Sequence, residues 1–131
     1  MVLSQRRASL LKRLTVRRQR ERERLVLVEG VRTLSEALRA GANVRFALVS
    51  GRLGSTDFGR NLEARLLAGG FDVTVIDDEE LAKVSSAESS QGVLAVCEQN
   101  QTTLEQVVSA SCPILILDAL QDPGNVGTLI R

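Results

Sequence analysis

The stretch that decides the fold is LVLVEGVR at residues 25–32, where an apolar run meets Glu-Gly and then a second periodic segment. The four apolar residues 25–28 predict a short buried strand. Beyond it, Leu34, Ala37 and Leu38 recur at helical spacing, so residues 31–40 are predicted to form a helix that Gly41 ends. The stretch therefore predicts a strand followed by a helix, as in an α/β fold.

The same alternation continues along the chain. Further strands are predicted at 44–50, 71–76 and 92–98, and helices are predicted at 58–68 and 77–84. Four strands interleaved with helices predict a mixed α/β layer fold. Phe46, Phe58 and Phe71 fall in these periodic segments and are expected in the core.

Ahead of the first strand lies a basic arm, residues 4–24, which contains no Gly or Pro and predicts one helix. On a helical wheel Leu3, Leu10 and Leu14 fall together, beside a stripe of arginines about 60° wide. The stripe consists of Arg6, Arg13, Arg17, Arg20 and Arg24. Because arginines in one stripe repel each other, we expect an anionic partner opposite them, with a solvated charged face as the alternative.

The charge distribution also indicates an anionic partner. Residues 1–24 hold nine Lys or Arg against two Glu, so they carry +7, while the remainder holds eight basic and fourteen acidic residues. A basic arm ahead of an acidic body is typical of nucleic-acid binding. Because the chain has no Trp or Tyr, we expect recognition of folded RNA by shape and phosphate. Arg52 and Gln91, in predicted loops, are further candidates for RNA contact.

Composition excludes several other classes. The chain has 131 residues, no His and two Cys, so a zinc site or a His-based triad is nearly excluded and no metal is expected. Cys97 and Cys112 are predicted to be small buried residues. No apolar run approaches the roughly 20 residues of a membrane span. Residues 1–7 lack the features of a signal peptide, so a cytoplasmic location is expected.

The most specific pattern is PILILDALQDPGNVGTLIR at residues 113–131. It predicts a strand at 113–117, an Asp-Pro-Gly turn and a helix from Val126, with Asn125 as the cap. The capped helix would direct free N–H groups toward the sheet edge where α/β proteins bind ligands. From these residues alone, the segment can be interpreted either as an anion-binding site or as a structural turn. Residues 99–112 are polar and predict a linker with a helical turn or two around 104–108.

Three segments resemble one protein family. DPGNVGTLIR at 122–131 resembles the first signature motif of the SpoU/TrmH family of RNA ribose 2′-O-methyltransferases, in the SPOUT superfamily. LVLVEGVR at 25–32 resembles the strand, Val-Glu-Gly and helix signature of the family's N-terminal substrate-binding domain. SQGVLAV at 90–96 is similar to that domain's last strand, with Ser90 where the family usually has Pro. The resemblance covers essentially the whole chain.

The resemblance implies a fold in two parts. Residues 1–98 would form a ribosomal-protein-like α/β/α sandwich that binds structured RNA, and residues 99–112 a linker. Residues 113–131 would be the truncated start of a knotted SPOUT α/β domain.

The resemblance also implies a chemistry. Asn125 and Arg131 match family residues that line the site at a homodimer interface. The family's arginine is thought to position or deprotonate the ribose 2′-hydroxyl, and because the pKa of arginine is far above neutral, we expect a mostly electrostatic role. The methyl donor would be S-adenosyl-L-methionine, held by motifs beyond Arg131. Residues 1–131 alone are therefore expected to bind RNA without activity, and a monomer is one expectation for them.

Three functions follow from these patterns. The leading one is methylation of a ribose in RNA, with ribosomal RNA of the 23S type as the expected substrate. The first alternative is a non-catalytic, ribosomal-protein-like RNA-binding module, and the second is a nucleotide-binding α/β protein unrelated to RNA. A Gly-x-Glu segment and an Ile-Pro-Met segment beyond Arg131 would favour the methyltransferase over the module. Salt-dependent binding of structured RNA would exclude the third.

Overall fold

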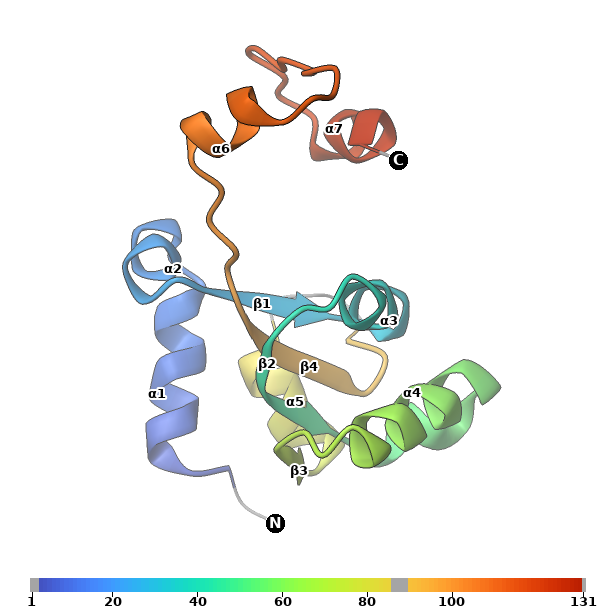
Figure 1. The fold of residues 1–131 in the computed structure, drawn as a ribbon. Helices are drawn as coiled ribbons and strands as arrows, with labels where there is room; N and C mark the ends of the chain where they lie inside the picture. Colours follow the sequence, from blue (N-terminus) through green and yellow to red (C-terminus); the bar gives the residue numbers. More distant parts are fainter. Residues whose placement is uncertain (1–2, 86–89, 131) are drawn as a thin grey trace. The chain divides into compact units, whose positions relative to one another are not determined.

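The computed structural model describes residues 3–85 and 90–130, and it contains two compact units, Met1–Asn100 and Gln101–Arg131. The first unit is drawn in blue to yellow-brown in Figure 1. Its elements are α1 (Gln5–Leu14), α2 (Arg17–Glu23), β1 (Leu25–Glu29), α3 (Val31–Arg39), β2 (Val44–Val49), the 3-10 helix η1 (Gly51–Ser55), α4 (Asp57–Ala68), β3 (Val73–Val75), α5 (Asp78–Val84) and β4 (Val93–Glu98). No helix among the described residues is long and apolar enough to cross a membrane.

The sheet has the order β1-β4-β2-β3, in which β4 is antiparallel to both of its neighbours and β2 is parallel to β3. The last strand thus lies between the first two. Glu29 of β1 pairs with Leu94, and Val49 of β2 pairs with Val93. The loops that follow β1 and β2 therefore meet the loop that precedes β4 at one end of the sheet.

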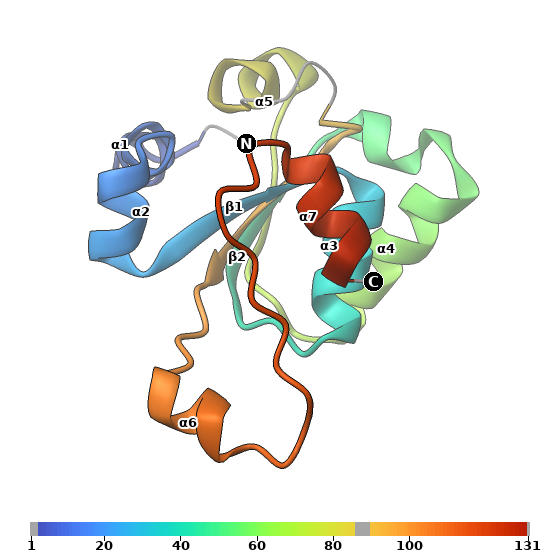
Figure 2. The ribbon, with the colours of Figure 1, turned by 90° about the horizontal axis from the view of Figure 1, so that it is seen from above.

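Helices cover both faces of this sheet, as Figure 2 shows. On one face α3 and α4 pack their buried Leu34, Leu62 and Leu66 against the strands. On the other face α1 and α5 do the same, with Leu11 and Leu81 among their buried residues. Strand side chains alternate between the two faces, so β1, β2 and β4 contribute to both cores. The predicted α/β/α sandwich is confirmed.

The basic arm is not the single helix that its composition predicts. α1 ends at Leu14, and α2 begins at Arg17 after Val16 takes an extended conformation (φ −91°, ψ 125°). Thr15 and Val16 are β-branched, which weakens a helix there. The Nη1 of Arg20 donates to the carbonyl oxygens of Leu14 and Thr15, at 3.0 and 2.8 Å. These hydrogen bonds satisfy carbonyl groups at the end of α1 and so stabilise the break between the two helices. The prediction of one helix with a single stripe of five arginines is therefore wrong.

The second unit also differs from its prediction. Its described residues, 101–130, form α6 (Leu104–Ser109) and α7 (Pro123–Ile130) and no strand. The helical turn predicted around 104–108 is confirmed as α6. The strand predicted at 113–117 is absent there, because a strand needs a neighbouring strand for its hydrogen bonds and these residues are exposed without one.

The cap of α7 was predicted at the wrong residue. The helix begins at Pro123, whose missing N–H is tolerated in a first turn. The carboxylate of Asp122 accepts a hydrogen bond from the N–H of Gly124 at 2.7 Å. Asp122 therefore serves as the cap, and Asn125 lies inside the first turn.

Of the three Phe and two Cys residues predicted to be buried, one of each is exposed. Phe46 is buried and Phe71 is partly buried, but Phe58 is 79% exposed. Cys97 is buried, which raises the pKa of its thiol, whereas Cys112 is exposed.

Candidate nucleic-acid interface

An open cavity of about 390 Å³ lies where the three loops meet at the end of the sheet. We call it the strand-end cavity. Its lining comes from the beginning of α3, from η1 and the first turn of α4, and from the residue before Gly92. These residues are Val31, Arg32, Arg52, Ser55, Thr56, Phe58 and Gln91.

Two glycines place η1 at this cavity. A Cβ on Gly59 would lie 1.7 Å from the carbonyl oxygen of Leu53, and a Cβ on Gly92 would lie 2.3 Å from the Leu53 nitrogen. Gly92 also has a positive φ of 81°, which side chains disfavour. Because only glycine allows these two approaches, η1 packs tightly between α4 and β4. This packing determines where Arg52 lies.

Gln91 has a structural role in the same place. Its Oε1 accepts a hydrogen bond from the N–H of Val31 at 3.0 Å. The residue before α3 is Gly30, which has no side chain to cap the helix, so Gln91 caps it from across the sheet end. Among the described residues, the amide nitrogen of Gln91 has no hydrogen-bond partner.

Within the described residues, the strand-end cavity carries positive charge with no acidic side chain opposite it. Arg32 and Arg52 are exposed, and neither has an ion-pair partner within the described part of the chain. No acidic side chain is among the described residues that line the cavity. Together with the exposed ring of Phe58, this lining suits a ligand that combines negative charge with a flat aromatic group.

A second basic region lies along the arm, where a cavity of about 360 Å³ brings Arg6 and Arg13 together with Arg7 and Arg45. Carboxylates reach into this region. Glu23 lies 3.8 Å from Arg13, and Glu98 lies 3.8 Å from Arg45. The positive charge of the arm is therefore partly neutralised from within the protein.

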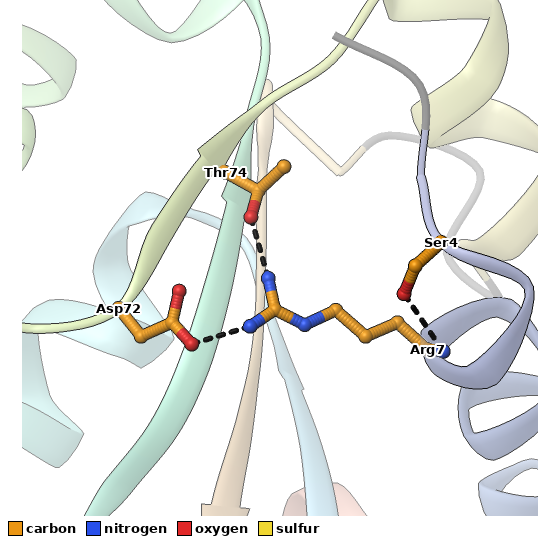
Figure 3. A network of polar contacts seen from close by, with 4 residues as sticks. All are labelled: Ser4, Arg7, Asp72 and Thr74. Atoms are coloured by element: carbon orange, nitrogen blue, oxygen red, sulfur yellow. Dashed lines mark hydrogen bonds and ion pairs between the residues drawn. The ribbon is translucent and has the colours of Figure 1, made fainter.

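Arg7 is the most engaged residue of the arm (Figure 3). Its guanidinium group extends from α1 to β3, where it donates to Thr74 Oγ1 at 2.6 Å and forms an ion pair with Asp72. The same group lies 4.6 Å from the ring centre of Phe46. These contacts anchor α1 on the sheet, so Arg7 is structural.

The remaining arginines of the arm do not gather at one place. Arg17 bonds Glu21 at 2.8 Å, and this hydrogen bond, followed by the charge of Glu21, raises the pKa of Arg17. Arg20 holds the end of α1, as described above. Arg24 is exposed and ends α2 with a positive φ of 53°. Of the five contact residues predicted on the arm, the structure brings together Arg6 and Arg13. The other two predicted contacts, Arg52 and Gln91, both line the strand-end cavity.

Of the predicted catalytic residues, Asn125 is exposed on α7 and Arg131 lies outside the described residues. None of the residues 113–130 is buried. The described residues also contain no group of three or more His, Cys, Asp or Glu that could hold a metal ion.

Sequence reasoning missed Arg32 and Phe58. Arg32 lies in the quoted signature, and its place two residues after Gly30 already puts it in the first turn of α3. Phe58 lies two residues after the cap Thr56, at the margin of a helix face centred on Gly59, Leu62 and Leu66. No sequence signal separates Phe58 from that face, because Phe58, Leu62 and Leu66 recur at helical spacing; only the burial of Gly59 in the structure does so.

Comparisons with known proteins agree with this architecture. The sequence model of the MRM3-like substrate binding domain matches residues 7–95. The chain is 29% identical over 120 residues to the 23S rRNA (guanosine(2553)-2′-O)-methyltransferase RlmP of Bacillus subtilis (strain 168), covering 92% of this chain and 44% of RlmP.

Two solved structures are similar as well. One, an RNA 2′-O ribose methyltransferase, is 28% identical with a TM-score of 0.73, over 97% of this chain and 48% of that one. The other is the SpoU methyltransferase AviRb from Streptomyces viridochromogenes in complex with AdoMet, 24% identical with a TM-score of 0.60, over 77% of this chain and 36% of that one. The likeness to AviRb shows the fold alone. The chain spans less than half of each of these three proteins.

The fold and the match at residues 7–95 define the first unit as a substrate-binding domain. The chain belongs to the family with the MRM3-like substrate binding domain, and the resemblance to the SpoU/TrmH methyltransferases is confirmed.

Proposed function

We propose that this chain is the RNA-binding part of a ribosomal RNA ribose 2′-O-methyltransferase, with RNA of the 23S type as substrate. The observation that carries the proposal is the match of residues 7–95 to a substrate-binding domain. The similarity to RlmP, whose name specifies 23S rRNA, supports the class of RNA. The arginines at the strand-end cavity and along the arm supply the charge that phosphates need.

The proposed RNA contacts differ in kind. Arg6, Arg13 and Arg17 are exposed on α1 and α2 and would contact phosphates. Arg24 and Arg52 would also contact phosphates, and the amide nitrogen of Gln91 would donate a hydrogen bond to the RNA. Arg20 acts mainly by holding the angle between α1 and α2, because its Nη1 is already bonded to that turn.

The methyl-transfer part of the proposal concerns residues 113–131 as the start of a SPOUT domain after a linker at 99–112. Asn125 and Arg131 would line the site in a homodimer, and the cytoplasm is the expected location. S-adenosyl-L-methionine would supply the methyl group. None of residues 113–130 is buried, and we propose that residues 1–131 alone neither hold this donor nor transfer its methyl group.

Binding of a structured ribosomal RNA fragment at increasing salt tests the RNA part. We expect log affinity to fall linearly with log salt, and Arg13→Glu with Arg17→Glu to weaken binding by at least about tenfold and flatten the slope. The matched control is Arg39→Glu with Arg65→Glu, which changes the net charge by the same amount. These two arginines lie in the last turns of α3 and α4. An equal loss in both double variants would contradict the proposed contacts of the arm.

Calorimetry with S-adenosyl-L-methionine tests the other part. We expect no heat of binding to residues 1–131 at micromolar donor. Micromolar binding, or transfer of a labelled methyl group to RNA by this chain, would show that the proposed division of roles is wrong.

A further inference from the structure

Phe58 is the most exposed large apolar side chain among the described residues of the first unit, at 79%. The core of α4 does not need it, because Leu62 and Leu66 already bury that face of the helix. Phe58 is one of the residues that line the strand-end cavity. An exposed aromatic ring beside a basic cavity is a stacking surface without a partner in the described chain.

The charges around this ring indicate the chemistry of the partner. Arg32 comes from α3 and Arg52 from η1, so the two arginines line the cavity from different elements. Other arginines, such as Arg7, Arg17 and Arg60, are held by carboxylates of the protein. Arg32 and Arg52 have no such partner in the described residues, so both are available to phosphate oxygens.

The size of the cavity limits what can enter. About 390 Å³ is near the lower end of the roughly 300–1,000 Å³ of small-molecule sites. A cavity of this volume accommodates one nucleotide. A base inside a duplex is stacked on its neighbours, so only an unpaired base can place its face on a protein ring.

We propose that the strand-end cavity binds a single unpaired nucleotide that projects from the RNA helix. The base stacks on Phe58, and its flanking phosphates bind Arg32 and Arg52. The amide nitrogen of Gln91, whose oxygen is fixed on Val31, donates to a carbonyl oxygen on the edge of the base. This inference rests on the proposed RNA binding and names the feature of the RNA that is recognised.

A hairpin RNA with one bulged 2-aminopurine tests the inference on the full chain. The protein has no Trp or Tyr, so protein fluorescence does not obscure the probe. We expect the bulged RNA to bind about tenfold more tightly than the same hairpin without the bulge, with a change in 2-aminopurine emission on binding. Equal binding of the two RNAs would overturn the inference and leave the proposed function standing. Failure to bind either RNA would instead contradict the proposed function.

Two substitutions of Phe58 distinguish stacking on an aromatic ring from contact with any apolar side chain. Phe58→Leu keeps an apolar side chain but removes the ring, so we expect the preference for the bulged RNA to disappear while binding of the paired RNA persists. Phe58→Trp keeps the preference and introduces the chain's only tryptophan, whose emission the bulged RNA should quench more than the paired RNA. Retention of the preference by Phe58→Leu, or equal quenching in Phe58→Trp, would overturn the inference. Because the ring is exposed, both variants should unfold at the temperature of the parent chain.

Discussion

The basic arm and the strand-end cavity both present arginines, but their guanidinium groups are in different states. Along the arm, Glu21 and Glu23 lie opposite Arg17 and Arg13. At the cavity, Arg32 and Arg52 have no carboxylate partner within the described residues. The difference teaches that the density of arginine in a sequence does not measure the charge that is available to a ligand. Two unengaged arginines on rigid elements can contribute more than several that are already paired.

The largest expected effect comes from breaking the geometry of the cavity. Gly59→Ala places a Cβ 1.7 Å from a backbone oxygen of η1, so we expect a loss of about 3 kcal/mol in the free energy of unfolding. Gly54→Ala is the matched control, because it lies in η1 itself and its Cβ would meet nothing within 4 Å. Urea denaturation measures both. Equal stability of the two variants would show that the close packing of η1 is not required.

The next effect removes charge from the cavity without changing its shape. We expect Arg32→Gln with Arg52→Gln to lower affinity for structured RNA by about tenfold and the salt slope by about 2, one for each phosphate contact. Arg17→Gln, which removes an arginine already paired with Glu21, should change both quantities less. Fluorescence anisotropy at several salt concentrations gives both values. A larger loss from Arg17→Gln would reverse the comparison between the two regions.

A smaller effect is expected at Arg7, the anchored member of the arm. Arg7→Met breaks the contacts to Asp72, Thr74 and Phe46, and we expect it to destabilise the fold by about 1 kcal/mol because the ion pair is partly exposed to water. Asp72→Asn and the double variant complete a thermodynamic cycle, read by thermal unfolding. Additive effects of the two substitutions would mean that the ion pair does not anchor α1.

The smallest effect releases a paired arginine. Glu21→Gln removes the negative charge, and it weakens the hydrogen bond, that together raise the pKa of Arg17. Since Arg17 stays protonated near neutral pH in either case, the change frees the guanidinium group rather than charging it. We expect affinity for RNA to rise by up to about twofold. Weaker binding by Glu21→Gln would show that Glu21 orients Arg17 for the RNA instead of competing with it.

The helices and strands of the first unit follow from local patterns, but their order in the sheet does not. Apolar runs and periodic leucines predict where segments such as β1 and α3 lie, because burial on one side imposes those spacings. The position of β4 between β1 and β2 depends on pairing across more than forty residues, which no local pattern encodes. The strand-end cavity exists only because of that pairing. The two β-branched residues Thr15 and Val16 are a sequence signal for the break between α1 and α2. The hydrogen bonds from Arg20 that stabilise the break cannot be seen in the sequence.

By itself, the sequence determined the α/β class, the basic arm and the family resemblance, because burial periodicity, composition and short motifs are properties of neighbouring residues. Only the tertiary structure decided which arginines remain available and that Phe58 lines the same cavity as two of them. Availability depends on which carboxylates, rings and carbonyls reach each side chain from distant parts of the chain, and those partners are known only once the sheet is assembled.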